Sequence, residues 1–189
     1  MVMSNRSRYI ALVAILLIAL FAAGCEPDQA VTGQPPAVKP PEKLAGPPAA
    51  ETMSVTVYHA TKDAAYLVAE TYTLPKTDKP VQAAVEQLLT GPKNPELIRA
   101  LPEGTKLKGI TVKDHIAYVD FNDKIIKNGS GGSAGEIMAV SAIVNTVTEF
   151  ADIYKVQIMV EGRKIHTLYG HMDTSEPLSR SEKIIKKSL

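Results

Sequence analysis

Seven prolines between Glu26 and Thr52 divide the chain into parts with different physical properties. The other residues of this stretch are mainly Ala, Gly, Gln and Lys, without a periodic apolar pattern. Proline removes a backbone donor and favours the extended polyproline II conformation, so the stretch cannot build a packed core. We interpret residues 26–52 as a disordered tether that extends by roughly 3 Å per residue. A proline-rich ligand for a partner domain is the alternative, although no clear P-x-x-P motif with flanking basic residues is present.

The residues before the tether have the order of a secretory signal peptide. Arg6 and Arg8 precede an uncharged, mostly apolar stretch that runs from Tyr9 to Gly24 and ends in small residues. A basic start, a short apolar core and small residues at the end are the three parts that export requires. The apolar stretch is shorter than the roughly 18 residues expected of a spanning helix. Residues 1–24 are therefore predicted to be a signal peptide, with an uncleaved membrane anchor as the alternative.

Cys25 gives this signal a more specific meaning. It is the only cysteine in the chain, so no internal disulfide can form. It directly follows Ala23 and Gly24, a pattern that resembles the lipobox of bacterial lipoproteins, although Ala22 stands where Leu is usual. The resemblance implies diacylglyceryl attachment at Cys25, and two acyl chains give a stable anchor. We expect a lipid-anchored protein at the extracytoplasmic face of the cell membrane; an ordinary secretory signal with a chance cysteine is the alternative.

Residues 53–178 are long enough for one domain with its own core. Alternating and helical apolar patterns, with their turn signals, predict the element order ββαββαββ. This order is typical of an α+β two-layer sandwich, with helices on one face of a small mixed or antiparallel sheet. Residues 179–189 are expected to form a polar tail. The predicted strands cover residues 55–58, 66–74, 105–112, 116–121, 155–160 and 164–168. One predicted helix begins near residue 78, a one-turn helix covers residues 95–100, and a long helix covers residues 134–150.

Composition excludes several classes of function. The chain has 21 basic and 20 acidic residues, so no excess charge indicates nucleic-acid binding. There is no Trp, which weakens the case for stacking against carbohydrate. His166, His171 and Asp173 come closest to a metal-ligand cluster, but their spacing matches no recurrent zinc pattern. We expect no metal and no cofactor, and we interpret the four histidines as surface or strand-end residues.

The glycine-rich stretch from Gly129 to Glu136 is the most unusual segment and permits three hypotheses. Residues 131–135 fit G-x-S-x-G, which would make Ser133 a hydrolase nucleophile, but no buried strand precedes them. A glycine loop before a helix can bind phosphate, but no Lys or Arg lies in this loop. The structural hypothesis makes Ser133 the N-cap and Glu136 its capping-box partner. On this hypothesis Gly131, Gly132 and Gly135 let the backbone turn tightly into the helix.

Several separated sequence blocks, in a fixed order, carry a family pattern. The blocks are Leu101–Thr105, Ala117–Asn122, Gly131–Glu136, Ala142–Phe150, Val156–Ile158 with Glu161–Gly162, and Gly170–Asp173. Together they resemble the GerMN domain, a family of sporulation and spore-germination proteins, over about residues 53–178, and one such domain is expected. The resemblance implies an α/β fold akin to ring-building motifs, and a role in protein interaction instead of catalysis.

The sequence therefore predicts a non-enzymatic envelope lipoprotein whose domain mediates protein–protein interaction or assembly during sporulation or spore germination. Its expected partners are the membrane, through the lipid on Cys25, and envelope proteins, with oligomerisation as a further option. A module that binds peptidoglycan or another glycan of the cell wall is the alternative. A serine hydrolase that uses Ser133 is the remote one.

Overall fold

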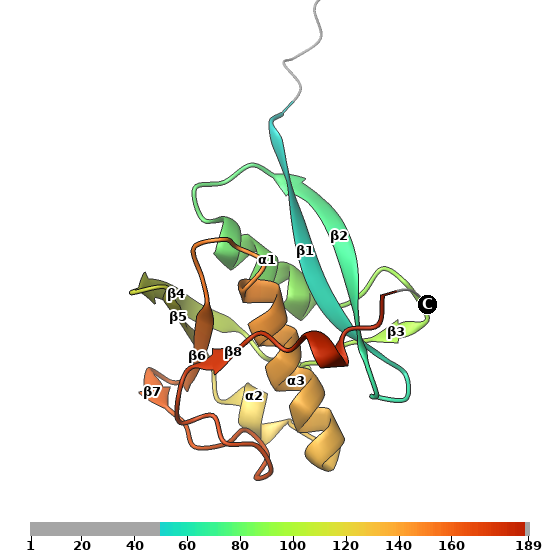
Figure 1. Cartoon of the computed structure of the whole chain (residues 1–189), viewed down its shortest axis with the longest axis vertical. Coiled ribbons are helices and arrows are strands. Elements are labelled where there is room, and N and C mark those ends of the chain that lie inside the picture. Colours follow the sequence, from blue (N-terminus) through green and yellow to red (C-terminus); the bar gives the residue numbers. More distant parts are fainter. Residues whose placement is uncertain (1–49, 188–189) are drawn as a thin grey trace, which may run out of the picture. The chain divides into compact units, whose positions relative to one another are not determined.

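Two hydrogen-bonded sheets surround a buried helix in the computed structural model, which describes residues 50–187 (Figure 1). The expected α+β class is confirmed. Cys25 and nearly all of the predicted tether lie outside the described residues. The elements are β1 Thr52–Thr61, β2 Leu67–Pro75, α1 Pro80–Thr90, β3 Leu97–Ile98, β4 Leu107–Lys113, β5 Ile116–Phe121, α2 Lys124–Lys127, α3 Gly132–Val147, β6 Lys155–Val160, β7 Arg163–Lys164, β8 Leu178–Ser179 and η1 Glu182–Ile184.

The first sheet has the order β2-β1-β3. β1 and β2 form an antiparallel hairpin, which the sequence predicts, with a register that runs from Thr52 opposite Pro75 to Ala60 opposite Leu67. β3 pairs with the other edge of β1, where Ala60 lies opposite Ile98. The helical turn predicted at residues 95–100 is wrong, because burial of the Leu97 side chain docks this segment beside the end of β1 as a short strand.

The second sheet has the order β4-β5-β6-β7, and β8 pairs with β6. β5 and β6 run parallel, since α2 and α3 return the chain to the starting edge between them. Along β5, Ala117, Val119 and Phe121 are fully buried, whereas the alternate residues Ile116, Tyr118 and Asp120 are half-buried. Because side chains alternate along a strand, this pattern shows that one face of the sheet points toward the core and the other points away from it.

α3 is buried around most of its circumference, not along one stripe as the periodicity predicts. Every residue from Met138 to Val147 is buried, because α3 packs against β1, β6 and α1. Its polar side chains consequently need partners within the protein. Thr146 Oγ1 accepts a 3.1 Å hydrogen bond from the backbone N–H of Tyr58 on β1. Among residues 50–187, no helix combines the length and the apolar character that crossing a membrane requires.

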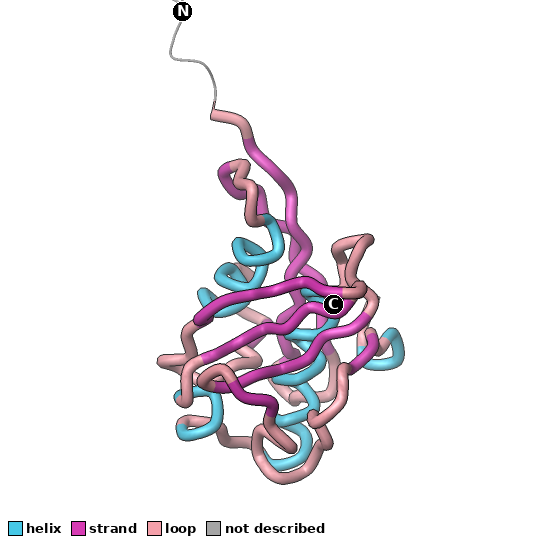
Figure 2. Tube along the Cα trace, turned by 90° about the vertical axis from the view of Figure 1, so that its left-hand side faces the viewer, coloured by secondary structure: helices cyan, strands magenta, loops and turns pink. Residues whose placement is uncertain are grey.

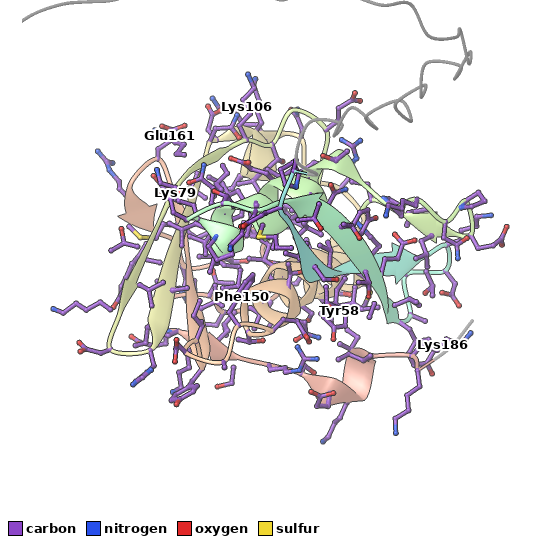
Figure 3. The ribbon with its side chains drawn as sticks, turned by 90° about the horizontal axis from the view of Figure 1, so that it is seen from above. Tyr58, Lys79, Lys106, Phe150, Glu161 and Lys186 are labelled. Carbon is purple, nitrogen blue, oxygen red and sulfur yellow. The ribbon has the colours of Figure 1, made fainter. Side chains whose placement is uncertain are left out.

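Residues 179–187, expected as part of a polar tail, pack on the domain. The Asn145 side chain makes two hydrogen bonds to the backbone of Ser181: it donates to the carbonyl and accepts from the N–H, at 3.0 Å each. The Arg180 guanidinium forms a 2.7 Å ion pair with Glu149 and also donates to the Tyr58 hydroxyl. Tyr58 lies inside the packed side chains and Lys186 at their periphery (Figure 3). All of these contacts are between polar groups, which is why apolar periodicity gives no sign of them.

Candidate functional site

The glycine-rich segment enters α3 differently from the capping-box prediction, which is wrong. The helix begins at Gly132, and the residue before it, Gly131, is left-handed with φ +101° and makes no side-chain cap. Glycine adopts this conformation without steric cost, so the helix starts earlier than expected. Ser133 is then an exposed residue of the first turn instead of the N-cap. Glu136, its expected partner, points elsewhere.

The Glu136 carboxylate is fully buried and organises the loop that follows β7. Its two oxygens accept five hydrogen bonds, four of them from consecutive or nearly consecutive backbone N–H groups. Such a ring of donors satisfies an ionised carboxylate away from water. The donors to Oε1 are Thr167 Oγ1 (2.6 Å), Leu168 N (2.8 Å) and Tyr169 N (2.8 Å), and those to Oε2 are His171 N (2.7 Å) and Met172 N (3.2 Å).

These donors determine the ionisation of the site. Burial acts to raise the pKa of Glu136, but the hydrogen bonds from the Thr167 hydroxyl and from the loop N–H groups outweigh it. The pKa of Glu136 is therefore held below its usual value, and the group is ionised at neutral pH. Burial, together with the nearby Glu136 charge, raises the pKa of Tyr169 to about 12.

Two glycines allow the loop and the helix to approach each other. A Cβ on Gly129 would lie 2.0 Å from the Tyr169 ring, and a Cβ on Gly135 would lie 2.7 Å from the Ser130 carbonyl oxygen. Both distances are too short for any side chain. The structural role predicted for the glycine loop thus has a concrete basis in close packing, and Gly129, the first residue of the glycine-rich stretch, contributes to it.

A groove of about 260 Å³ opens beside the glycine loop, where three distant parts of the sequence meet. The hairpin end of the first sheet, the strand β3 and the start of α3 form its walls. Ile98, 39% exposed, lies on β3 at the edge of the sheet and borders the groove. The lining is mostly apolar and includes Ala60, Ala64, Ile98, Leu101, Pro102 and Met138, with Arg99 and the loop residues Ser130, Gly131 and Gly135.

The structure does not assemble a nucleophile site around Ser133. The short helix α2 precedes the glycine loop, where a nucleophile elbow needs a buried strand. Within residues 50–187, the Ser133 hydroxyl makes no hydrogen bond to a histidine or a carboxylate. His166 and Asp173 do meet, at 3.3 Å, but both side chains are mostly exposed. No group of three potential metal ligands occurs in the described part of the chain.

One histidine contradicts the surface interpretation. His59 on β1 is fully buried, and its Nε2 lies 3.1 Å from the Tyr72 hydroxyl, which itself donates to Glu70 at 2.7 Å. Burial lowers the pKa of His59 to about 4, despite the opposing effect of the Glu70 charge. His59 is therefore neutral at physiological pH and joins two strands and the segment after α1. The other three histidines are exposed, as predicted.

Comparison with known proteins gives the family. A family model described as "Germane: Sporulation and spore germination" matches residues 56–166, more than half of the chain. The chain belongs to the Germane family. This finding confirms the resemblance to the GerMN domain that the sequence blocks indicate. The match ends before the Glu136-bound loop, so the donors from Thr167 to Met172 lie beyond it.

The match to a Germane relative covers only part of that relative's length. The chain is 30% identical to the spore germination protein GerM of Bacillus subtilis over 125 residues, which cover 63% of the chain and 33% of GerM. It therefore spans about one third of this relative. The solved first GerMN domain of GerM superposes with a TM-score of 0.59 at 26% identity, covering 68% of the chain and 98% of that structure.

The solved tandem GerMN domains of GerM superpose with the same TM-score at 25% identity. This match covers 78% of the chain but only 51% of the tandem structure. The match thus extends over about half of the tandem structure.

Replacing Glu136 by Gln should destabilise the Germane domain by about 2–4 kcal/mol, because the amide loses the charge and turns its NH₂ toward N–H donors. The pKa of Glu136 is lowered in the folded state, so its contribution is present above the unfolded pKa and is lost as the pH falls through the folded one. Denaturant unfolding across this acidic range should show a smaller pH dependence in Glu136→Gln. If the stability and its pH dependence were unchanged in Glu136→Gln, the role of Glu136 in holding the loop from Thr167 to Met172 would be contradicted.

Replacing Gly129 by Ala should destabilise the domain by about 1–3 kcal/mol, since the new methyl group would displace the Tyr169 ring. Gly109→Ala is the matched control, because a Cβ there meets no atom within 4 Å. Thermal unfolding of the two variants checks this difference. Equal melting temperatures would contradict the close packing of Gly129 on Tyr169.

Proposed function

We propose that this protein is a non-enzymatic envelope lipoprotein of sporulation or spore germination, whose Germane domain docks a protein partner at the outer face of the cytoplasmic membrane. The lipid on Cys25 and the tether of residues 26–52 would hold the domain at that face. Membership of the Germane family supports the link to sporulation and germination. The partner-binding role is supported by the groove beside β3.

The groove suits an extended segment of a partner protein. Among the described residues 50–187, β3 is an edge strand that pairs only with β1, so its outer edge can accept a further strand. The adjoining groove is mostly apolar and has room for apolar side chains of that segment. Backbone pairing would supply affinity and the groove would supply selectivity, as in other cases of strand addition.

Two buried polar residues of the family blocks are used for folding, which supports interaction over catalysis. Glu136, the one carboxylate of the glycine block, has its oxygens committed to five donors. Asn145, in the next block of α3, is committed to the backbone of Ser181.

Ile98→Glu should reduce recovery of the partner from crosslinked membranes by roughly tenfold, because a charge would be buried in an apolar contact. Val112→Glu is the matched control, since Val112 is also an exposed strand residue, at 47%, but lies on the second sheet. Sporulation and germination assays on the same strains provide a second readout. Equal behaviour of the two variants would contradict the groove as the docking site, and enrichment of both on purified wall sacculi would favour the cell-wall alternative.

Cys25→Ser should release the folded domain from the membrane or leave it as an uncleaved precursor, because the thiol that would carry the diacylglycerol is gone. Membrane fractionation, combined with the mobility of the chain on a denaturing gel, distinguishes the two. A variant that stays membrane-bound in its processed form and supports sporulation would refute the lipid anchor.

A further inference from the structure

The second sheet has a face that no helix covers. Figure 2 shows its strands in front of the helices, with that face toward the viewer. The pairing register places Tyr118 opposite Thr111 and Ile116 opposite Lys113, on the side away from the buried Ala117 and Val119. The same register continues across β6 and β7, except that Gln157, which lies opposite Tyr118, is fully buried and donates to the Thr174 carbonyl at 2.9 Å, so the segment after β7 covers this position. We call the rest of this side the open face, and its residues are Thr111, Lys113, Ile116, Tyr118, Asp120, Lys155, Met159 and Lys164.

The centre of the open face is apolar. Ile116, Tyr118 and Met159 lie on this face and are half-buried. At the end of the face, the Tyr154 side chain is 62% exposed and stacks on the His115 ring with 4.6 Å between the ring centres. Tyr and Met are enriched in protein interfaces relative to other surfaces. The open face therefore has the composition of a contact surface.

The border of the open face is basic. Lys113, Lys155 and Lys164 come from three different strands, and none of them forms an ion pair with another residue in the range 50–187. Asp120 is the one carboxylate that the register places on this face, and it accepts a 2.9 Å hydrogen bond from Gly162 N–H. An anionic partner would be attracted to this border, and it would meet the apolar centre on contact.

The aromatic end of the open face is held in place by the hairpin turn. Asp114 and His115 are both left-handed, with φ +51° and +61°, although neither is glycine. The His115 carbonyl accepts from Tyr154 N–H at 2.9 Å, and its Nδ1 lies 3.0 Å from the Asp152 carbonyl oxygen. These contacts fix the stacked pair before any partner arrives, which reduces the ordering that binding would require.

We propose that the open face binds a protein surface with acidic groups around an apolar centre. A protein partner matches both parts of the face, whereas a simple polyanion would use only the lysines. The face belongs to the second sheet and is distinct from the groove beside β3, so the proposal stands independently of that groove. A chain with both surfaces could contact two partners, or two parts of one.

The test uses the full-length chain and a labelled peptide that alternates Glu with Val and Leu. Its counterpart with Gln in place of Glu is the second probe, and fluorescence anisotropy is the readout. The acidic peptide should bind with an affinity that falls as salt is added, and the Gln peptide should bind at least roughly tenfold more weakly.

Lys113→Glu, Lys155→Glu and Lys164→Glu together should weaken the acidic peptide by at least roughly tenfold. The matched control reverses Lys79, Lys183 and Lys187, exposed lysines outside the second sheet that likewise form no ion pair within residues 50–187, and should change affinity little. Tyr154→Ala, a substitution at a mostly exposed position, should weaken binding severalfold while the melting temperature stays unchanged.

Three outcomes would overturn the proposal. The first is equal binding of the acidic and Gln peptides, and the second is an equal loss in the control reversal. The third is lysine-dependent binding to vesicles rich in phosphatidylglycerol without binding of the peptide, which would assign the face to a lipid surface instead.

Discussion

The ring of donors around the Glu136 carboxylate holds together a region that has few other means of staying ordered. The loop from Thr167 to Met172 buries one large apolar side chain fully, that of Leu168, so apolar packing alone cannot fix it. The buried charge supplies what the packing lacks, because several N–H groups reach a common acceptor away from water. Once the loop is fixed, Tyr169 can pack on Gly129, and the glycine segment is held beside the groove.

The elements that the sequence predicted best have strong internal periodicity. β1, β2, α1, β5 and α3 are long enough for their apolar patterns to determine their type, although α3 is buried around most of its circumference. β3, β7 and β8 are each two residues long and exist because a neighbouring strand accepts them. No local pattern encodes such a strand, and Leu97 could be read equally well as part of a helical turn.

The glycine segment shows the same limit at the level of single residues. Its structural role could be predicted, because glycines before a helix indicate a tight entry. The partner of Glu136 could not, since capping rules look three residues away and the true donors lie 31 to 36 residues along the chain. His59 is similar, because nothing next to it in the sequence reveals that its ring contacts the Tyr72 hydroxyl, which in turn donates to Glu70.

The long hairpin of β1 and β2 also determines how the domain would respond to mechanical force. The chain enters the domain at the Thr52 end of β1, the upper end in Figure 1. Ala60, which lines the groove, lies near the opposite end of the same strand. A pull between an anchored N-terminal segment and a partner seated in the groove would therefore run along β1. Its hydrogen bonds to β2 would be loaded in shear, all at once, instead of being opened one after another. The same hairpin that builds the sheet would thus carry tension between the two attachment points without unzipping.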